Sequence, residues 1–201
     1  DLDLPFVGVG LMYKHGYFRQ TIDADGQQQH FYPEYDLHRL PLLPVVDEMG
    51  REVQVAVDFP GRMVWIRGWK ADVGRVPVLL LDTDVPENHP ADRPVTSILY
   101  VRGREMRLSQ ELVLGVGGFE ILKALGIAPS VWHMNEGHAA FLTLERLGRL
   151  VRRQGLTLET AREAVRANTA FTTHTPVPAG HDRFGEDLMR RYFSDVPDWV
   201  G

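Results

Sequence analysis

Apolar positions in the first half of the chain follow the patterns of β-strands. Residues 5–13 are apolar on both alternating faces, which predicts a buried strand. Residues 53–59 alternate between apolar and polar, residues 60–61 (Pro-Gly) provide a turn, and residues 63–69 return as a second strand. The continuous apolar run at 76–81 predicts one more buried strand. The first half is therefore expected to contain a strand followed by an antiparallel excursion.

The segments between these strands are polar and rich in proline. Residues 14–36 are polar and aromatic, and the prolines from Pro33 onward are expected to keep most of this stretch out of regular structure. Residues 84–94 hold three prolines and are expected to form a loop. The aromatic and amide side chains between Tyr13 and Tyr35 would suit the faces and hydroxyl edges of a sugar. They would equally suit loop packing, and both interpretations stay open.

The second half of the chain changes to a helical period. The pattern predicts a helix at 106–125, a strand at 130–134, helices at 139–153 and 158–167, a strand at 171–174 and a helix at 186–193. Thr157 is expected to cap the third of these helices. This order is typical of a parallel, doubly wound α/β layer. The chain thus divides into a buried strand (1–13), a loop and β-hairpin excursion (14–105), and α/β core units (106–201).

The composition narrows the class of protein. The chain has 201 residues, of which 44% are hydrophobic and 24% charged, which suits one globular domain. It has no cysteine, so no disulfide and no thiol nucleophile can form. The net charge of −5 provides no broad basic surface for nucleic acid. No apolar run approaches the roughly 20 residues of a membrane helix, and the first residues do not resemble a signal peptide. We therefore expect a cytoplasmic protein with neither a nucleic acid nor a membrane as partner.

Polar side chains gather where two of the predicted strands end, at residues 132–138 and 172–184. In open α/β sheets, ligands bind outside the carboxyl ends of strands, where helix N-termini also offer backbone N–H groups. Two adjacent strands that each end in a loop with a histidine therefore form a reasonable architecture for a binding site.

A plainer interpretation of the same residues stays open. Asn135 would only cap a helix, Glu136 would be favoured in its first turn, and His138 would fill an interior gap. The prolines at 176 and 178 would make the second loop rigid for purely structural reasons.

Two other kinds of site find no support in the sequence. His133 and His138 are five residues apart, which is not the spacing of a helical zinc pair, and no His-Glu-x-x-His segment occurs. No metal site is therefore expected. A Gly-x-Ser-x-Gly elbow is also missing, so a hydrolase triad has no basis.

Four segments together resemble the α-glucan (glycogen, starch and maltodextrin) phosphorylases. Gly10–Gln20 resembles their Gly-x-x-Tyr-x-x-Gly-x-Phe-x-Gln segment, and His133–His138 resembles their Asn-Asp/Glu-x-His segment. Thr173–Pro178 is similar to their His-Thr-x-x-Pro loop, and Arg107–Glu111 to the segment that opens the helix between them. The segments follow the order of the family across nearly the whole chain. The Asn-Glu-Gly-His form resembles the bacterial and archaeal branch.

The resemblance implies a fold and an activity. The family has a two-domain GT-B architecture, and this chain resembles an internal part of its N-terminal, Rossmann-like domain. The implied reaction transfers a glucosyl unit from an α-1,4-glucan to phosphate and yields glucose 1-phosphate with retained configuration. Family members bind pyridoxal phosphate through a lysine and form dimers, so the implied partners are glucan, phosphate, the remaining phosphorylase domain and a second copy of the enzyme.

The resemblance also assigns site residues. His174 matches the histidine that contacts glucose in the donor pocket, and Asn135, Glu136 and His138 match the segment that borders it. Asp182 and Arg183 are weaker candidates in the neighbouring loop. The family commonly has Asp where this chain has Glu136. No residue in this chain is assigned a catalytic role.

The cofactor lysine of the family lies in its second domain, and no segment of this chain matches that domain. We therefore expect that the chain alone binds no pyridoxal phosphate covalently and is inactive. Two alternatives stay open. One is part of a sugar-nucleotide-dependent GT-B glucan synthase, and the other is a non-catalytic glucan-binding or interaction domain.

Overall fold

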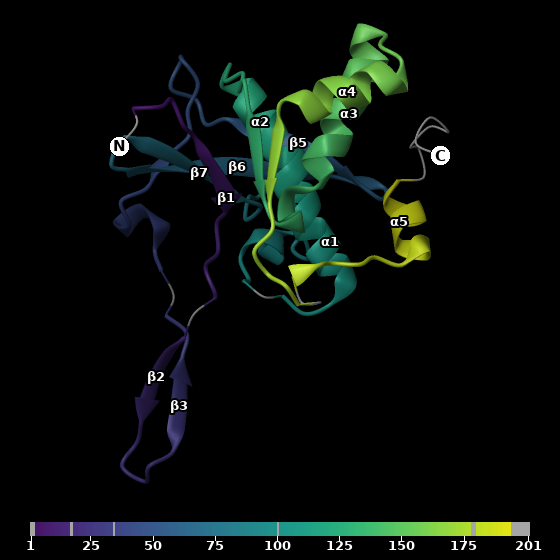
Figure 1. The fold of residues 1–201 in the computed structure, drawn as a ribbon. Helices are drawn as coiled ribbons and strands as arrows, with labels where there is room; N and C mark the ends of the chain where they lie inside the picture. The colour runs from purple at the N-terminus through teal and green to yellow at the C-terminus, as the bar shows by residue number, and fades with distance from the viewer. Residues whose placement is uncertain (1–2, 17, 34, 100, 178–179, 194–201) are drawn as a thin grey trace.

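The computed structural model describes residues 3–16, 18–33, 35–99, 101–177 and 180–193, and within them the fold is α/β. A five-stranded sheet forms one layer, and helices from the second half of the chain pack against it (Figure 1). Its strands are β1 (Gly8–Leu11), β4 (Leu43–Pro44), β5 (Gln54–Phe59), β6 (Arg62–Val73) and β7 (Val76–Asp82). Strand β1 pairs with β7 in parallel, whereas β6 pairs antiparallel with β7, β5 and β4.

The predicted hairpin at 53–69 is confirmed, and it extends further than expected. Strands β5 and β6 pair with Val57 opposite Val64, and Gly61 turns between them with a φ of +71°. Strand β6 then continues to a second tight turn at Gly74, where φ is +63°, and returns as β7. Because tight turns join only antiparallel strands, most of this sheet is antiparallel. This agrees with the antiparallel excursion predicted for the first half of the chain.

A second hairpin was not expected. Strands β2 (Arg19–Ile22) and β3 (Gln28–Phe31) pair antiparallel, every residue in them is exposed, and the hairpin extends away from the body of the molecule (Figure 1). The Asp23 carboxylate shapes the turn by accepting the backbone N–H groups of Asp25 and Gln27. The prediction of irregular structure fails here because the proline run begins at Pro33, after the second strand has ended.

The helix expected at 106–125 is interrupted. It consists of α1 (Arg104–Leu112), a π-helical turn η3 (Val113–Gly117) and α2 (Gly118–Ala124). Gly115 lies in the π turn against the start of α3 (Phe141–Gln154), so close that a Cβ atom there would lie 2.7 Å from the backbone nitrogen of Leu142. The remaining helices are α4 (Leu158–Ala167) and α5 (Glu186–Tyr192), with 3₁₀ turns η1 (Leu37–Arg39), η2 (Arg93–Thr96) and η4 (Gly137–Ala139). Thr157 caps α4 as predicted, since its Oγ1 accepts the N–H of Thr160 at 3.2 Å.

A separate parallel pair carries the two polar loops. Strand β8 (Trp132–Asn135) pairs with β9 (Thr169–Thr172), and α3 and α4 connect them. Asn135 lies opposite Thr172 at the carboxyl ends of the strands. The prediction that two adjacent strands end together is confirmed, although β9 begins two residues before the predicted 171–174.

The core lies between the five-stranded sheet and the helices. Side chains from β6, β7, α1 and α2 interlock there with no exposed area, among them Val64, Ile66, Leu81, Leu108 and Ile121. No helix among the described residues is long and apolar enough to cross a bilayer.

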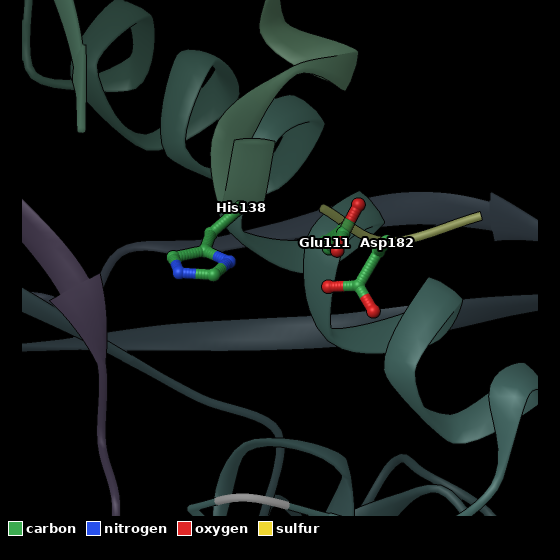
Figure 2. Close-up of side chains that lie close together, drawn as sticks. All are labelled: Glu111, His138 and Asp182. Atoms are coloured by element: carbon green, nitrogen blue, oxygen red, sulfur yellow. The ribbon is translucent and has the colours of Figure 1, made fainter. Parts of the chain in front are cut away.

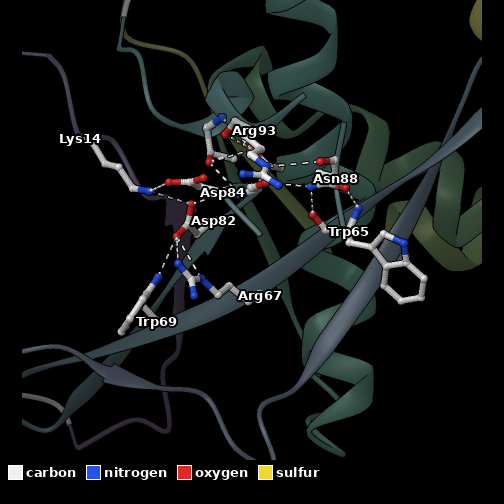
Figure 3. A network of polar contacts seen from close by, with 10 residues as sticks. Lys14, Trp65, Arg67, Trp69, Asp82, Asp84, Asn88 and Arg93 are labelled. Carbon is white, nitrogen blue, oxygen red and sulfur yellow. Dashed lines mark hydrogen bonds and ion pairs between the residues drawn. The ribbon is translucent and has the colours of Figure 1, made fainter. Parts of the chain in front are cut away.

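The last residue of β7, Asp82, is a buried carboxylate. Asp82 has no exposed area, and its Oδ2 accepts the indole N–H of Trp69 at 3.0 Å (Figure 3). Arg67 contacts the same oxygen at 3.2 Å, and Lys14 lies 3.4 Å from Oδ1. A buried charge needs such partners to offset its lost hydration. This network ties the segment after β1 to β6 and β7.

Candidate functional site

The candidate site forms where β8 and β9 end side by side. Asn135 is the last residue of β8, and His174 follows β9 by two residues. Asn135 Oδ1 lies 2.8 Å from His174 Nε2, and the backbone N–H of Glu136 donates to the Thr172 carbonyl. The parallel register therefore brings together three residues from two segments that are separate in the sequence.

The side chain of Glu136 holds the loop that follows β9 by accepting hydrogen bonds from the backbone of that loop. Its carboxylate Oε1 accepts the N–H groups of His174 and Thr175, each at 2.8 Å, and Thr173 Oγ1 donates to Oε2 at 3.4 Å. The side chain is buried, with 3% of the residue exposed. The hydrogen bond from the His174 backbone is the main reason that the pKa of Glu136 falls to about 2.

The backbone of Glu136 is strained. Its φ of +60° and ψ of −170° lie in a region that glycine populates almost alone. Such a conformation persists only where the surroundings over-determine it, and here the buried carboxylate and its two amide donors do so. The plainer interpretation is therefore wrong for Asn135 and Glu136. Asn135 belongs to a strand, and the Glu136 side chain caps no helix.

His174 and Asn135 are both exposed, whereas Glu136 is buried. The side chain of His174 is 59% exposed, and its Nδ1 lies 3.5 Å from Glu136 Oε1. The Asn135 side chain and the Glu136 carboxylate thus contact the two different nitrogens of the ring. The imidazole is therefore oriented by its neighbours while most of it stays accessible to solvent.

A second cluster centres on Arg107 of α1. Arg107 Nε contacts Asp182 Oδ2 at 2.9 Å and Glu111 Oε1 at 3.2 Å, and Arg107 Nη2 contacts His138 Nδ1. Arg104 adds a contact to Asp182 at 3.2 Å. The cluster joins α1, η4 and the loop before α5.

Burial sets the protonation of the carboxyl groups in this cluster. Burial first, and then the neighbouring Asp182, raise the pKa of Glu111 to about 8, although the positive charge of Arg107 acts to lower it. Burial opposes ionisation of Asp182 as well, but hydrogen bonds from Arg107 and Glu111 hold its pKa below the ordinary value. Glu111 is thus the protonated partner at neutral pH, and Asp182 the charged one.

Glu111, His138 and Asp182 each place a ligand atom within 4.8 Å of the others, a separation that a metal ion could bridge (Figure 2). The guanidinium of Arg107 contacts all three residues, however, and brings a positive charge to that position. The donor set therefore favours an ion-pair cluster over a metal centre.

The structure sorts the residues predicted from sequence into two groups. Asn135, Glu136 and His174 meet directly, while His138 and Asp182 belong to the Arg107 cluster.

The residue after Asp182, Arg183, is exposed and belongs to neither group. Arg107 and Glu111 are not among the site residues that the sequence predicts. Their spacing of four residues on a helix, which places an acid and a base on one face, was the available signal.

The three lysines do not fit a covalently bound pyridoxal phosphate at this site. Lys14 pairs with Asp82 and Asp84, Lys70 with Asp72, and Lys123 with Glu120. Each ammonium group is thus matched to a carboxylate outside both clusters.

Comparison with known proteins finds named phosphorylases that are similar to this chain. No family model matches it. Maltodextrin phosphorylase of Thermococcus litoralis is 46% identical over 201 residues, which cover 98% of this chain and 24% of that protein. Glycogen phosphorylase of Mycobacterium tuberculosis is 47% identical over 97% of this chain and 23% of its own length, and that of Aquifex aeolicus is 35% identical over 100% and 29%. The chain is thus homologous, over nearly all of its residues, to about a quarter of the length of glycogen and maltodextrin phosphorylases.

Proposed function

We propose that this chain supplies part of the glucosyl pocket of an α-1,4-glucan phosphorylase, within the N-terminal domain of a GT-B fold. The enzyme would transfer a glucosyl unit from the glucan end to phosphate with retained configuration. The observation that carries the proposal is the contact of His174 with Asn135 and Glu136 at the ends of β8 and β9. It occurs in a chain that is 46–47% identical to named phosphorylases.

The chemistry of this group suits a sugar. Glucose presents hydroxyl groups that both donate and accept hydrogen bonds, and the exposed Asn135 amide and His174 ring offer both kinds of partner. Binding sites of this type need side chains held in place before the ligand arrives. Glu136 provides that support, because its carboxylate accepts the backbone N–H groups of His174 and Thr175 and so fixes the start of the loop after β9.

The proposal assigns pyridoxal phosphate to the part of a phosphorylase that lies outside the quarter matched by this chain. That cofactor supplies acid–base chemistry to phosphate when it is bound. The contribution of this chain is confined to binding and orienting the sugar. Incubation of the chain with the cofactor and borohydride should trap no lysine, and a modified Lys14, Lys70 or Lys123 would contradict this assignment.

The names of the relatives favour a phosphorylase over a sugar-nucleotide-dependent glucan synthase. A test uses the protein encoded by the complete reading frame that contains this segment. With maltodextrin and phosphate it should release glucose 1-phosphate. Incorporation of glucose from a sugar nucleotide, without phosphorolysis, would overturn the proposal.

The role of His174 is tested in the same protein. His174→Ala should lower kcat/KM by about tenfold or more, since a lost hydrogen bond of about 1.4 kcal/mol corresponds to tenfold. His89→Ala is the matched control, because His89 is exposed in the loop at 84–94 and lies outside both clusters. Equal activity of the two variants would remove His174 from the pocket.

A further inference from the structure

His138 is held on one side by an arginine. Arg107 Nη2 contacts His138 Nδ1, and Nε of the same guanidinium contacts the carboxyl groups of Asp182 and Glu111. The resemblance that marked His138 as a pocket residue says nothing about this support, and the proposed function does not use it.

The contact determines which ring nitrogen carries the proton. Every polar hydrogen of a guanidinium is a donor, and the group has no acceptor. His138 Nδ1 must therefore offer its lone pair to Arg107. The ring is then neutral, with its N–H on Nε2. One ring nitrogen faces the two carboxyl groups and the other points away from them (Figure 2).

The surroundings of His138 both lower and raise its pKa. Its pKa is lowered first by burial and then by the positive charge of Arg107, and to a lesser extent by His174. Asp182 and Glu136 oppose this by favouring the imidazolium. The net direction is downward, so the neutral ring that the geometry requires is also the form that the local charges favour.

Arg107 itself has little freedom to move. Its side chain is 19% exposed, and Asp182 and Glu111 contact its Nε from two different elements. Asp182 also binds Arg104, which holds the carboxylate in place. An arginine restrained in this way can fix the orientation of the imidazole before any ligand binds.

We propose that Arg107 is a positioning residue that holds His138 as the neutral ring with its N–H on Nε2, so that His138 presents a hydrogen-bond donor. The acceptor would be a hydroxyl oxygen of the bound sugar, and that part rests on the proposed function. The positioning itself requires no ligand.

The test is two-bond ¹H–¹⁵N NMR of the imidazole groups in this chain, recorded as a function of pH. In the unaltered chain, His138 should show the pattern of a single Nε2–H tautomer and a titration midpoint below the usual value of about 6.5. Arg107→Met should give a mixture of tautomers and a higher midpoint, because a positive neighbour is lost and Asp182 remains.

Two further variants separate positioning from general damage. Asp182→Asn should also give mixed tautomers, but with a lower midpoint, because it removes a negative neighbour. Arg104→Met is the matched control, since Arg104 contacts Asp182 but not His138, and it should leave the Nε2–H pattern intact.

An Nδ1–H pattern in the unaltered chain would overturn the proposal, as would an unchanged Nε2–H pattern in folded Arg107→Met. The experiment contains no glucan, so failure of the proposed function would leave its result standing. Conversely, failure here would leave phosphorolysis by the complete protein untouched.

Discussion

The Glu136 carboxylate accepts the backbone N–H of His174 at 2.8 Å, so a side chain at the end of one strand fixes the main chain that follows its neighbour. The contact spans 38 residues of sequence. It explains how an exposed histidine in a proline-rich loop can still have a defined position.

Replacing this carboxylate should loosen the loop. Glu136→Gln keeps the size of the side chain but removes the charge that two amide donors share, so the amide hydrogens of His174 and Thr175 should exchange faster with solvent. The Thr160 amide, which bonds to Thr157, is the internal control and should not change. Equal protection of His174 and Thr175 in both proteins would show that the loop is held by other contacts.

The same residue predicts an acid-dependent loss of stability. The pKa of Glu136 is about 2 in the folded protein and about 4.5 when unfolded, so its contribution is complete above about pH 4.5 and is lost as the pH falls toward 2. Urea unfolding of the unaltered chain and of Glu136→Gln should therefore converge as the pH is lowered from 6 to 3. A constant difference in urea midpoint across that range would contradict the assignment.

Glu111 should give the opposite dependence of stability on pH. Its folded pKa of about 8 lies above its unfolded value of about 4.5, so the folded protein loses stability as the pH rises between these values and is constant above them. Glu111→Gln mimics the protonated acid and should reduce this loss of stability with rising pH. Its urea midpoint should exceed that of the unaltered chain most clearly near pH 8. Glu163→Gln, at an exposed position of α4, is the control and should not alter the pH dependence.

The π turn predicts unequal effects of two glycine substitutions. Gly115→Ala would place a Cβ atom 2.7 Å from the backbone nitrogen of Leu142, which cannot move alone, and should cost about 1–3 kcal/mol in the free energy of unfolding. Gly148→Ala, within α3, meets only the end of the flexible Arg152 side chain and should be neutral or stabilising by up to about 1 kcal/mol. Equal unfolding free energies would show that α3 can shift to make room.

The buried network at Asp82 predicts a cost for losing one donor. Trp69→Phe removes the indole N–H that Asp82 Oδ2 accepts and should destabilise the protein by about 1–3 kcal/mol. Trp65→Phe is the control, since Trp65 is 38% exposed and Asn88 bonds to its backbone; it should change stability by less than about 0.5 kcal/mol. The free energy of unfolding of both variants is to be measured by urea unfolding. A Trp69→Phe cost no larger than that of Trp65→Phe would mean that Arg67 and Lys14 suffice for Asp82.

Local patterns predicted what depends on local rules. Alternation and a Pro-Gly turn were enough for β5 and β6, and the end of each predicted strand located Asn135 and His174. The positive φ of Glu136 could not be predicted in this way, because it depends on amides that lie 38 and 39 residues away. The contact of Arg107 with Asp182 joins residues 75 positions apart and carries no local signal.

The β2–β3 hairpin also has a consequence for how the chain melts. All of its strand residues are exposed, and within the part of the chain that the structure describes its strands pair only with one another, so its hydrogen bonds are not coupled to the packing of the core. Two isolated strands are only marginally stable in water. The hairpin should therefore open and close as an independent unit far below the temperature at which the rest unfolds. A protease that cuts at residues 23–27 would leave two pieces that remain associated through β1 and β7.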